Sequence, residues 1–127
     1  MTDIGTLSGG TTSAASAVTY DGLVVMGSAN TADGSGRAIP WTDAGGIIDL
    51  GALGGARSEA IAMSNDGSMV VGGSKTAIIE NSQSVHHTYR WEVGANGINT
   101  KMTDLGTLGG NRSYAWDVNA SGTIVVG

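Results

Sequence analysis

The sequence contains no cysteine and no phenylalanine, a single proline, and charged side chains at 13% of its 127 positions. The lack of cysteine excludes disulfides, thiol redox chemistry and thiolate metal sites. No apolar run exceeds four residues, as in Leu23 to Met26, so none is long enough for a membrane-spanning helix. The first residues carry neither the basic segment nor the apolar segment that together form a signal peptide.

Positive charge is also scarce, and the net charge is −5. The six basic residues are scattered along the chain: Arg37, Arg57, Lys75, Arg90, Lys101 and Arg112. Proteins that bind nucleic acids concentrate such residues in a patch that follows the phosphates. We therefore expect no nucleic-acid partner.

Glycine, by contrast, is abundant, with 22 residues. Each glycine inside a helix costs about 1 kcal/mol relative to alanine, so this composition argues against long helices. Many short strands joined by turns are expected instead. The length predicts one domain, or a part of a larger repeat array.

One motif organises the chain, because it occurs three times. It reads Asp-Leu-Gly-Thr-Leu-Gly-Gly at 104–110 and Asp-Leu-Gly-Ala-Leu-Gly-Gly at 49–55, and 3–10 repeats it with Ser8 inserted. The copies start 46 and 55 residues apart, an interval typical of solenoids, propellers and repeat arrays. We divide the single array into units 3–48, 49–103 and an incomplete 104–127.

The segments that follow the motif also align. The positions in register are Ser13, Ser58 and Ser113; Ala15, Ala60 and Ala115; Val18, Met63 and Val118; and the pairs Asp21-Gly22, Asp66-Gly67 and Ser121-Gly122. An Asp-Gly pair between apolar segments predicts a hairpin. The returning strands, 23–27, 69–72 and 124–127, are apolar on both faces, which indicates a neighbouring sheet on each side.

Two further strands complete each unit. The third is expected at 38–41 and 88–91, and period-two alternation places its aromatic and apolar residues on one face: Ile39 with Trp41, and Tyr89 with Trp91. Pro40 is compatible with this strand only where its missing N–H goes unused. We expect variable loops at 29–36 and 75–87, and glycine turns at 43–46 and 94–97. A fourth strand then runs into the next Asp-x-Gly, and residues 1–7 are the first such strand.

Four short antiparallel strands in 45 to 55 residues are typical of a β-propeller blade. The predicted fold is therefore all-β, built from tandem four-stranded antiparallel blades. About two complete blades with flanking strands would form a partial β-propeller.

These motifs together resemble the HAF family of probable extracellular repeats. The resemblance rests on Asp-Leu-Gly-Thr-Leu-Gly-Gly, then Ser-x-Ala, Val-Val-Gly and an aromatic residue before x-Trp, and it covers essentially the whole chain. Ile39-Pro40-Trp41 departs from the usual Phe-x-Trp, and Ser8 is an insertion. The resemblance implies a long bacterial surface or secreted protein, often the passenger part of an autotransporter. It implies no ligand and no catalytic residue.

The aspartates that open the motifs are candidate calcium ligands, but a structural role is favoured. A short side chain at a strand end can accept backbone N–H bonds and hold the connection between blades. The sequence contains neither of the known Asp-rich and Gly-rich calcium motifs. We assign structural roles to the repeated residues Asp3, Gly5, Asp49, Gly51, Asp104, Gly106, Gly22, Gly67, Gly122, Trp41 and Trp91, and expect no metal and no cofactor.

The candidate binding residues are His86, His87, Glu80 and Trp116. The two histidines could offer imidazole to zinc, but neighbours in an extended segment point to opposite faces and no third ligand lies nearby. We expect them to be solvated residues of the 75–87 loop, which also holds Glu80 and is the predicted contact surface. Trp116 is placed where the other copies carry Ala17 and Ala62, as either a binding aromatic or a core residue.

Nothing in the sequence predicts catalysis. There is no Gly-x-Ser-x-Gly elbow, and the glycine-rich segment 32–36 lacks the Gly-Lys-Ser/Thr of a phosphate loop. The acids outside motifs and turns are few, so Glu59, Glu80 and Asp117 would converge only by chance. We predict a non-catalytic extracellular scaffold that binds a protein or a glycan at the cell surface.

Three other expectations remain open. The alternative function is a fragment of a carbohydrate-active propeller enzyme, sialidase-like or lyase-like. Several copies could also assemble into one closed ring. The apolar strand 124–126 is expected to leave an unpaired edge that promotes self-association, and any membrane attachment would need a separate anchor domain.

Overall fold

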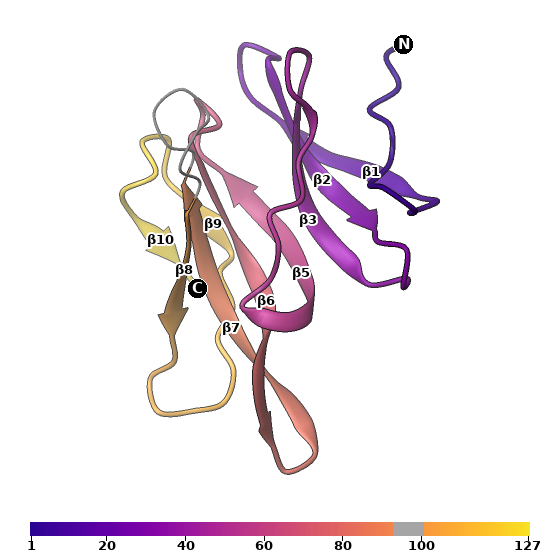
Figure 1. The fold of residues 1–127 in the computed structure, drawn as a ribbon. Helices are drawn as coiled ribbons and strands as arrows, with labels where there is room; N and C mark the ends of the chain where they lie inside the picture. Colours follow the sequence, from indigo (N-terminus) through magenta and orange to yellow (C-terminus); the bar gives the residue numbers. More distant parts are fainter. Residues whose placement is uncertain (93–100) are drawn as a thin grey trace.

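The computed structural model describes residues 1–92 and 101–127. All regular structure in these residues is β, and it forms three antiparallel sheets that follow one another in chain order (Figure 1). The predicted all-β class and the antiparallel sheets of four strands are confirmed. Among the described residues, no helix has the length and apolarity needed to cross a membrane.

Each sheet keeps its strands in sequence order. The first contains β1 (Ser13–Val18), β2 (Val24–Asn30), β3 (Gly36–Thr42) and β4 (Gly46–Ile47). The second contains β5 (Gly54–Met63), β6 (Met69–Glu80), β7 (Gln83–Glu92) and β8 (Lys101–Gly106). The third pairs β9 (Asp117–Val118) with β10 (Val125–Val126).

The second sheet is covered on both faces, as the apolar returning strand predicts. Val70 on β6 belongs to the cluster between the first and second sheets, and its neighbour Val71 belongs to the cluster between the second and third. Both valines are fully buried. The first of these clusters consists of Met26, Ala38, Leu50, Val70, Tyr89 and Trp91. Burial of this apolar surface is what joins consecutive sheets.

A β-bulge in the first and second units explains the glycine of Val-Val-Gly. The pairing of β1 with β2 shifts at Ser16, and that of β5 with β6 shifts at Ile61. A Cβ on the glycine opposite would overlap a backbone carbonyl of the first strand in all three units, at Gly27, Gly72 and Gly127. Only glycine permits this close approach of the two strands.

Pro40 shortens the fourth strand of the first sheet. Its carbonyl accepts a bond from the Ile48 N–H at 3.0 Å, so its missing N–H also faces β4, where a regular pair would exchange two bonds. The equivalent residue in β7 is Arg90, and β8 beside it is six residues long against two in β4. The proline therefore lies where its lost donor weakens only a short edge strand.

Several predicted elements are wrong in detail. Residues 1–7 form no strand; Leu7 is buried and Ile4 packs beside it on the first sheet, but no strand pairs with this segment among the described residues. The loop predicted at 29–36 is present but shorter, with residues 31–35 between β2 and β3, whereas the loop predicted at 75–87 is largely strand. In particular, β6 and β7 continue to a two-residue turn at Asn81 and Ser82, both with positive φ, and this hairpin projects beyond the sheet (Figure 1). The predicted turn at 94–97 lies outside the described residues.

Candidate functional site

The aspartates of the repeated motif hold turns. The Oδ1 atoms of Asp3, Asp49 and Asp104 each accept the backbone N–H of the glycine two residues later, at 2.7 to 2.8 Å. Those glycines, Gly5, Gly51 and Gly106, all have positive φ. This is the turn-forming role that the sequence indicates for these residues. The described residues contain no group of three potential ligands that could hold a metal ion.

The serine in register after each motif closes the same turn from the other side. Its hydroxyl donates to the carbonyl of the turn glycine in all three units, at 2.5 to 2.7 Å, through Ser13, Ser58 and Ser113. In the second and third units the oxygen also accepts a backbone N–H from the preceding sheet, that of Ala38 or Thr88. We call this the serine bridge, because it joins consecutive sheets. The repeated serine is structural.

A basic side chain on the third strand approaches the motif aspartate. Arg37 Nε on β3 lies 3.9 Å from an Asp49 carboxylate oxygen, and His87 Nδ1 on β7 lies 2.7 Å from an Asp104 carboxylate oxygen. Arg37 and His87 hold equivalent positions, both two residues before the buried Ile39 or Tyr89. His87 is therefore part of the repeat framework, and the expectation of a solvated loop histidine is wrong for it.

His86 lies on the opposite face of β7, as the strand alternation requires. Its Nε2 atom lies 3.9 Å from a Glu59 carboxylate oxygen, and the ring covers Gly73, where a Cβ would overlap the imidazole Cε1. The His86 side chain is only 20% exposed, so it too is not a solvated loop residue. Among the described residues, neither histidine belongs to a group of three potential metal ligands.

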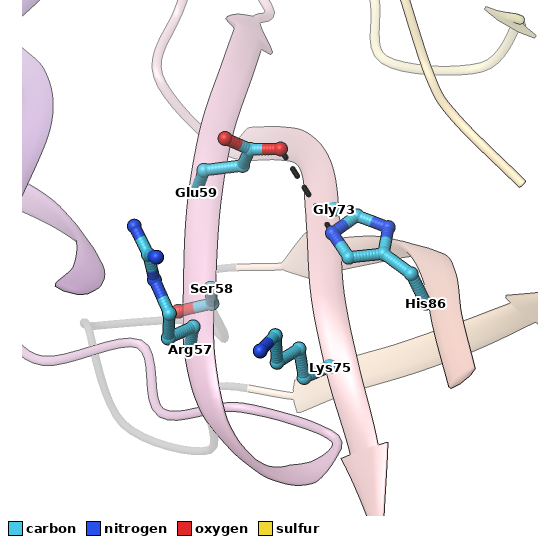
Figure 2. A pocket seen from close by; sticks show the side chains of 6 residues that line it. All are labelled: Arg57, Ser58, Glu59, Gly73, Lys75 and His86. Atoms are coloured by element: carbon cyan, nitrogen blue, oxygen red, sulfur yellow. Dashed lines mark ion pairs between the residues drawn. The ribbon is translucent and has the colours of Figure 1, made fainter. Parts of the chain in front are cut away.

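A pocket of about 210 Å³ opens beside His86. It is lined by Arg57, Ser58 and Glu59 of β5, Gly73 and Lys75 of β6, and His86 of β7. Figure 2 shows Arg57, Glu59, Lys75 and His86 around this hollow, with Glu59 directed toward the imidazole. The pocket thus combines two permanent cations, one carboxylate and one imidazole.

The first unit has a pocket at the equivalent place, with a volume of about 280 Å³. Its walls include Thr12, Ser13, Ala14, Ser28, Asn30 and Gly36, which match the residues of the first pocket position by position, together with Arg57, Ser58 and Glu59. Of the described residues, only Arg57 and Glu59 bring charge to this second pocket. The charged pocket is therefore a specialised version of a space that the fold repeats.

An aromatic strip extends from the charged pocket onto the third unit. His86 stacks on Tyr114 with ring centroids 5.2 Å apart, and Tyr114 stacks on Trp116 at 6.4 Å. The planes differ by only 27° and 25°. Trp116 is 69% exposed and Tyr114 45% exposed, so one edge of the strip is open to solvent.

Trp116 occupies the position of Ser16 and Ile61, not that of Ala17 and Ala62 as expected from the sequence. It stands two residues before Val118, just as Ile61 stands two before Met63. In the first two units this is the bulge position, and the Trp116 N–H donates to the Val126 carbonyl at 2.8 Å. Bulges redirect a side chain, which accounts for its exposure instead of a place in the core.

The other sequence candidates lie elsewhere. Glu80 is at the exposed end of the β6–β7 hairpin, and Asp117 begins β9; neither lines the charged pocket. Trp91 is buried in the core and Trp41 is half-buried, in keeping with their structural assignment.

Sequence reasoning missed Arg57, Lys75 and Tyr114. One signal was present: Arg57-Ser58 and Arg112-Ser113 repeat an arginine before the bridging serine. Lys75 and Tyr114 have no counterpart of the same type in the other units, so only their spatial neighbours reveal them. No family model, curated protein or solved structure matches the chain.

Proposed function

We propose that this chain is a non-catalytic repeat module of a bacterial surface or secreted protein, a scaffold that presents a binding surface. The observation that carries the proposal is the use of the repeated polar residues. The motif aspartate, its glycine and the bridging serine are all engaged in hydrogen bonds that build and join the units. The same bonds recur from unit to unit, which indicates that these side chains build the array.

The proposed architecture is a propeller-like array of blades. Its support is the constant relation between neighbours: each sheet packs face to face on the next, and the serine bridge recurs at both junctions. The extracellular location and the kinship with HAF repeats rest on the motif residues alone. Protease treatment of intact bacteria that express the natural gene product tests that location, because a surface module would be cleaved and an internal one protected.

A carbohydrate-active enzyme is the second candidate, and one observation speaks for it: the charged pocket holds a carboxylate, Glu59, beside a histidine. Glycoside hydrolysis by paired acids needs two carboxyl groups on either side of the scissile bond. Among the residues that the structure describes, Glu59 is the only acid that lines this pocket. The pocket composition therefore favours binding over hydrolysis.

The test is incubation of the protein with a panel of glycosides and acidic and neutral polysaccharides, with chromatography of the products. We expect every substrate to be recovered intact. Turnover that is abolished by Glu59→Gln, Glu80→Gln or Asp117→Asn would overturn the proposal in favour of the enzyme.

A further inference from the structure

The charged pocket has an excess of positive charge that the protein does not neutralise. Neither Arg57 nor Lys75 forms an ion pair with any residue that the structure describes. Glu59, the one carboxylate of the pocket, is directed toward His86 (Figure 2). Arginine presents a planar fork of N–H donors that matches a carboxylate, and lysine adds a point charge. The unpaired groups fit a ligand that carries a carboxylate.

The aromatic strip supplies a second, independent feature next to the pocket. His86 lines the pocket and also stacks on Tyr114, so the pocket and the strip share this ring. Trp116, at the end of the stack and 69% exposed, offers flat apolar surface, and Tyr114 supports it from behind. A pyranose ring has one face of C–H groups that can pack on such a surface, while its hydroxyls remain hydrogen-bonded.

The positions of Tyr114 and Trp116 are exposed in the middle unit as well as in the third. In the middle unit, which has a sheet on each side, Ile61 occupies the Trp116 position and is 41% exposed. Glu59 occupies the Tyr114 position, and its side chain is 57% exposed. The first strands therefore present an open edge along the stack, and the third unit places aromatic rings on it.

We infer that the charged pocket and the aromatic strip together bind an acidic sugar, as part of a uronic-acid-containing oligosaccharide. The carboxylate is held by Arg57 and Lys75, and a neighbouring sugar ring packs on Trp116, which Tyr114 supports. Glu59 and His86 are positioned to bond sugar hydroxyls. This inference rests on the proposed non-catalytic binding function and names its ligand class.

The experiment is a titration of the full chain with trigalacturonate, in which calorimetry and tryptophan fluorescence monitor binding. Maltotriose serves as a neutral oligosaccharide, acetate as a bare carboxylate, and triglutamate as an acidic peptide. We expect saturable binding of trigalacturonate that raised salt weakens, with a change in Trp116 fluorescence. Maltotriose, acetate and triglutamate should each bind at least about tenfold more weakly, because each lacks either the charge or the ring face.

Four variants locate the site. Arg57→Gln and Lys75→Gln remove the charges, Trp116→Ala removes the exposed ring, and Gly73→Ala displaces the His86 ring. Each should weaken trigalacturonate binding by about tenfold, the loss expected for one charge-assisted bond or one stacked ring. Lys101→Gln is the control, because Lys101 is an exposed cation of β8 outside the pocket and its loss should leave the affinity unchanged. Circular dichroism verifies that each variant is folded.

The outcomes separate the two proposals. Absence of trigalacturonate binding, binding unaffected by Arg57→Gln and Lys75→Gln, or equal binding of maltotriose, acetate or triglutamate would overturn the acidic-sugar site and leave the scaffold function standing. Cleavage of trigalacturonate during the titration would instead overturn the non-catalytic function. Saturable binding of intact trigalacturonate that the pocket variants weaken supports both.

Discussion

At the scale of single residues, the hydroxyl of the serine bridge connects the motif turn of one unit to the sheet of the preceding unit. Ser58 Oγ donates to the Gly51 carbonyl at 2.5 Å and accepts the Ala38 N–H at 3.1 Å. Ser58 is also buried. Removing its hydroxyl leaves a half-buried carbonyl and a buried amide without this partner, and each such group costs free energy.

We expect Ser58→Ala to lower the free energy of unfolding by about 2 kcal/mol. Urea unfolding followed by circular dichroism measures it. Ser13→Ala is the matched control, because Ser13 makes the same bond to Gly5 but bridges to no other sheet and is less buried. Its loss should cost less than about 1 kcal/mol. Equal losses at the two positions would show that the bond to the preceding sheet contributes nothing.

The sequence could predict that the serine is structural, since the position recurs in each unit. It could not predict the bond to Ala38 or Thr88, because that bond depends on how far one sheet is displaced along the next. The same limit applies to the pocket: Arg57 and Lys75 are separated by 18 positions and meet His86 only through strand pairing and the ring's place over Gly73.

At the scale of elements, the same hairpin turn occurs in all three units but is held by different side chains. In the second unit Asp66 accepts the Ser68 N–H and the Ser64 hydroxyl, and the first unit does the same with Asp21. In the third unit Asn119 Oδ1 accepts the Ile124 N–H, and Ser121 replaces the aspartate. The turn geometry is kept while the carboxylate is lost.

The turn carboxylates make stability depend on acidity. The bonds from the Ser68 amide and the Ser64 hydroxyl lower the pKa of Asp66 from 3.8 to about 2. A carboxyl with a lower pKa in the folded state stabilises the fold above its unfolded pKa, and this contribution is lost as pH falls to about 2. We expect the stability difference between the wild type and Asp66→Asn to be largest above about pH 4 and to shrink toward pH 2.

Urea unfolding at a series of pH values measures that difference. Ser121→Ala is the control, because the third turn holds no carboxylate in this position and its effect should not vary between pH 2 and 6. A constant difference between the wild type and Asp66→Asn over the whole range would contradict the prediction.

The β-bulge opposite Gly72 leads to a second prediction at the scale of elements. A methyl group at Gly72 would overlap the Glu59 carbonyl and approach the Tyr89 hydroxyl, which itself donates to that carbonyl at 3.1 Å. We expect Gly72→Ala to destabilise the protein by about 3 kcal/mol, because neither backbone can move away without breaking the ladder. Gly110→Ala places the same methyl group in open space and should change stability by less than about 0.5 kcal/mol. Thermal unfolding of the wild type and the two variants measures both changes in stability.

Strand order and the apolar returning strands could be predicted, because residues such as Val70 and Val71 form runs that only a doubly covered strand explains. The strand ends could not. Residues 75–87 have no equivalent of the same length in the first unit, yet backbone pairing of β6 with β7 continues through them, and the two-residue turn lacks the glycine that usually marks it. Conversely, residues 1–7 carry the motif, but no strand in the described part of the chain pairs with them.

At the scale of the molecule, the outer face of the third sheet is exposed, whereas the equivalent faces of the first and second sheets are buried. Val126 holds the position of Met26 and Val71, both buried between sheets, but is itself 53% exposed. Nearby Ile124 is also exposed. An apolar sheet face of this kind promotes association with another copy or another sheet.

We propose that the chain self-associates through this face. Sedimentation velocity should show an average mass that rises with concentration for the wild type and stays at the monomer value for Val126→Lys. Leu23→Lys, at an exposed turn residue of the first unit, should behave as the wild type. A monomeric wild type at all concentrations, or equal effects of both substitutions, would contradict this.

The serine bridge also governs how the array unfolds. Because a hydroxyl of each later unit completes the hydrogen bonding of the sheet before it, no sheet at a junction reaches its lowest free energy alone. Nearest-neighbour coupling of this kind makes a linear array melt as one cooperative block, up to the weakest junction. A chain with more such units would then gain steepness in its denaturation curve with every junction added, and a severed bridge would weaken the coupling across its own junction.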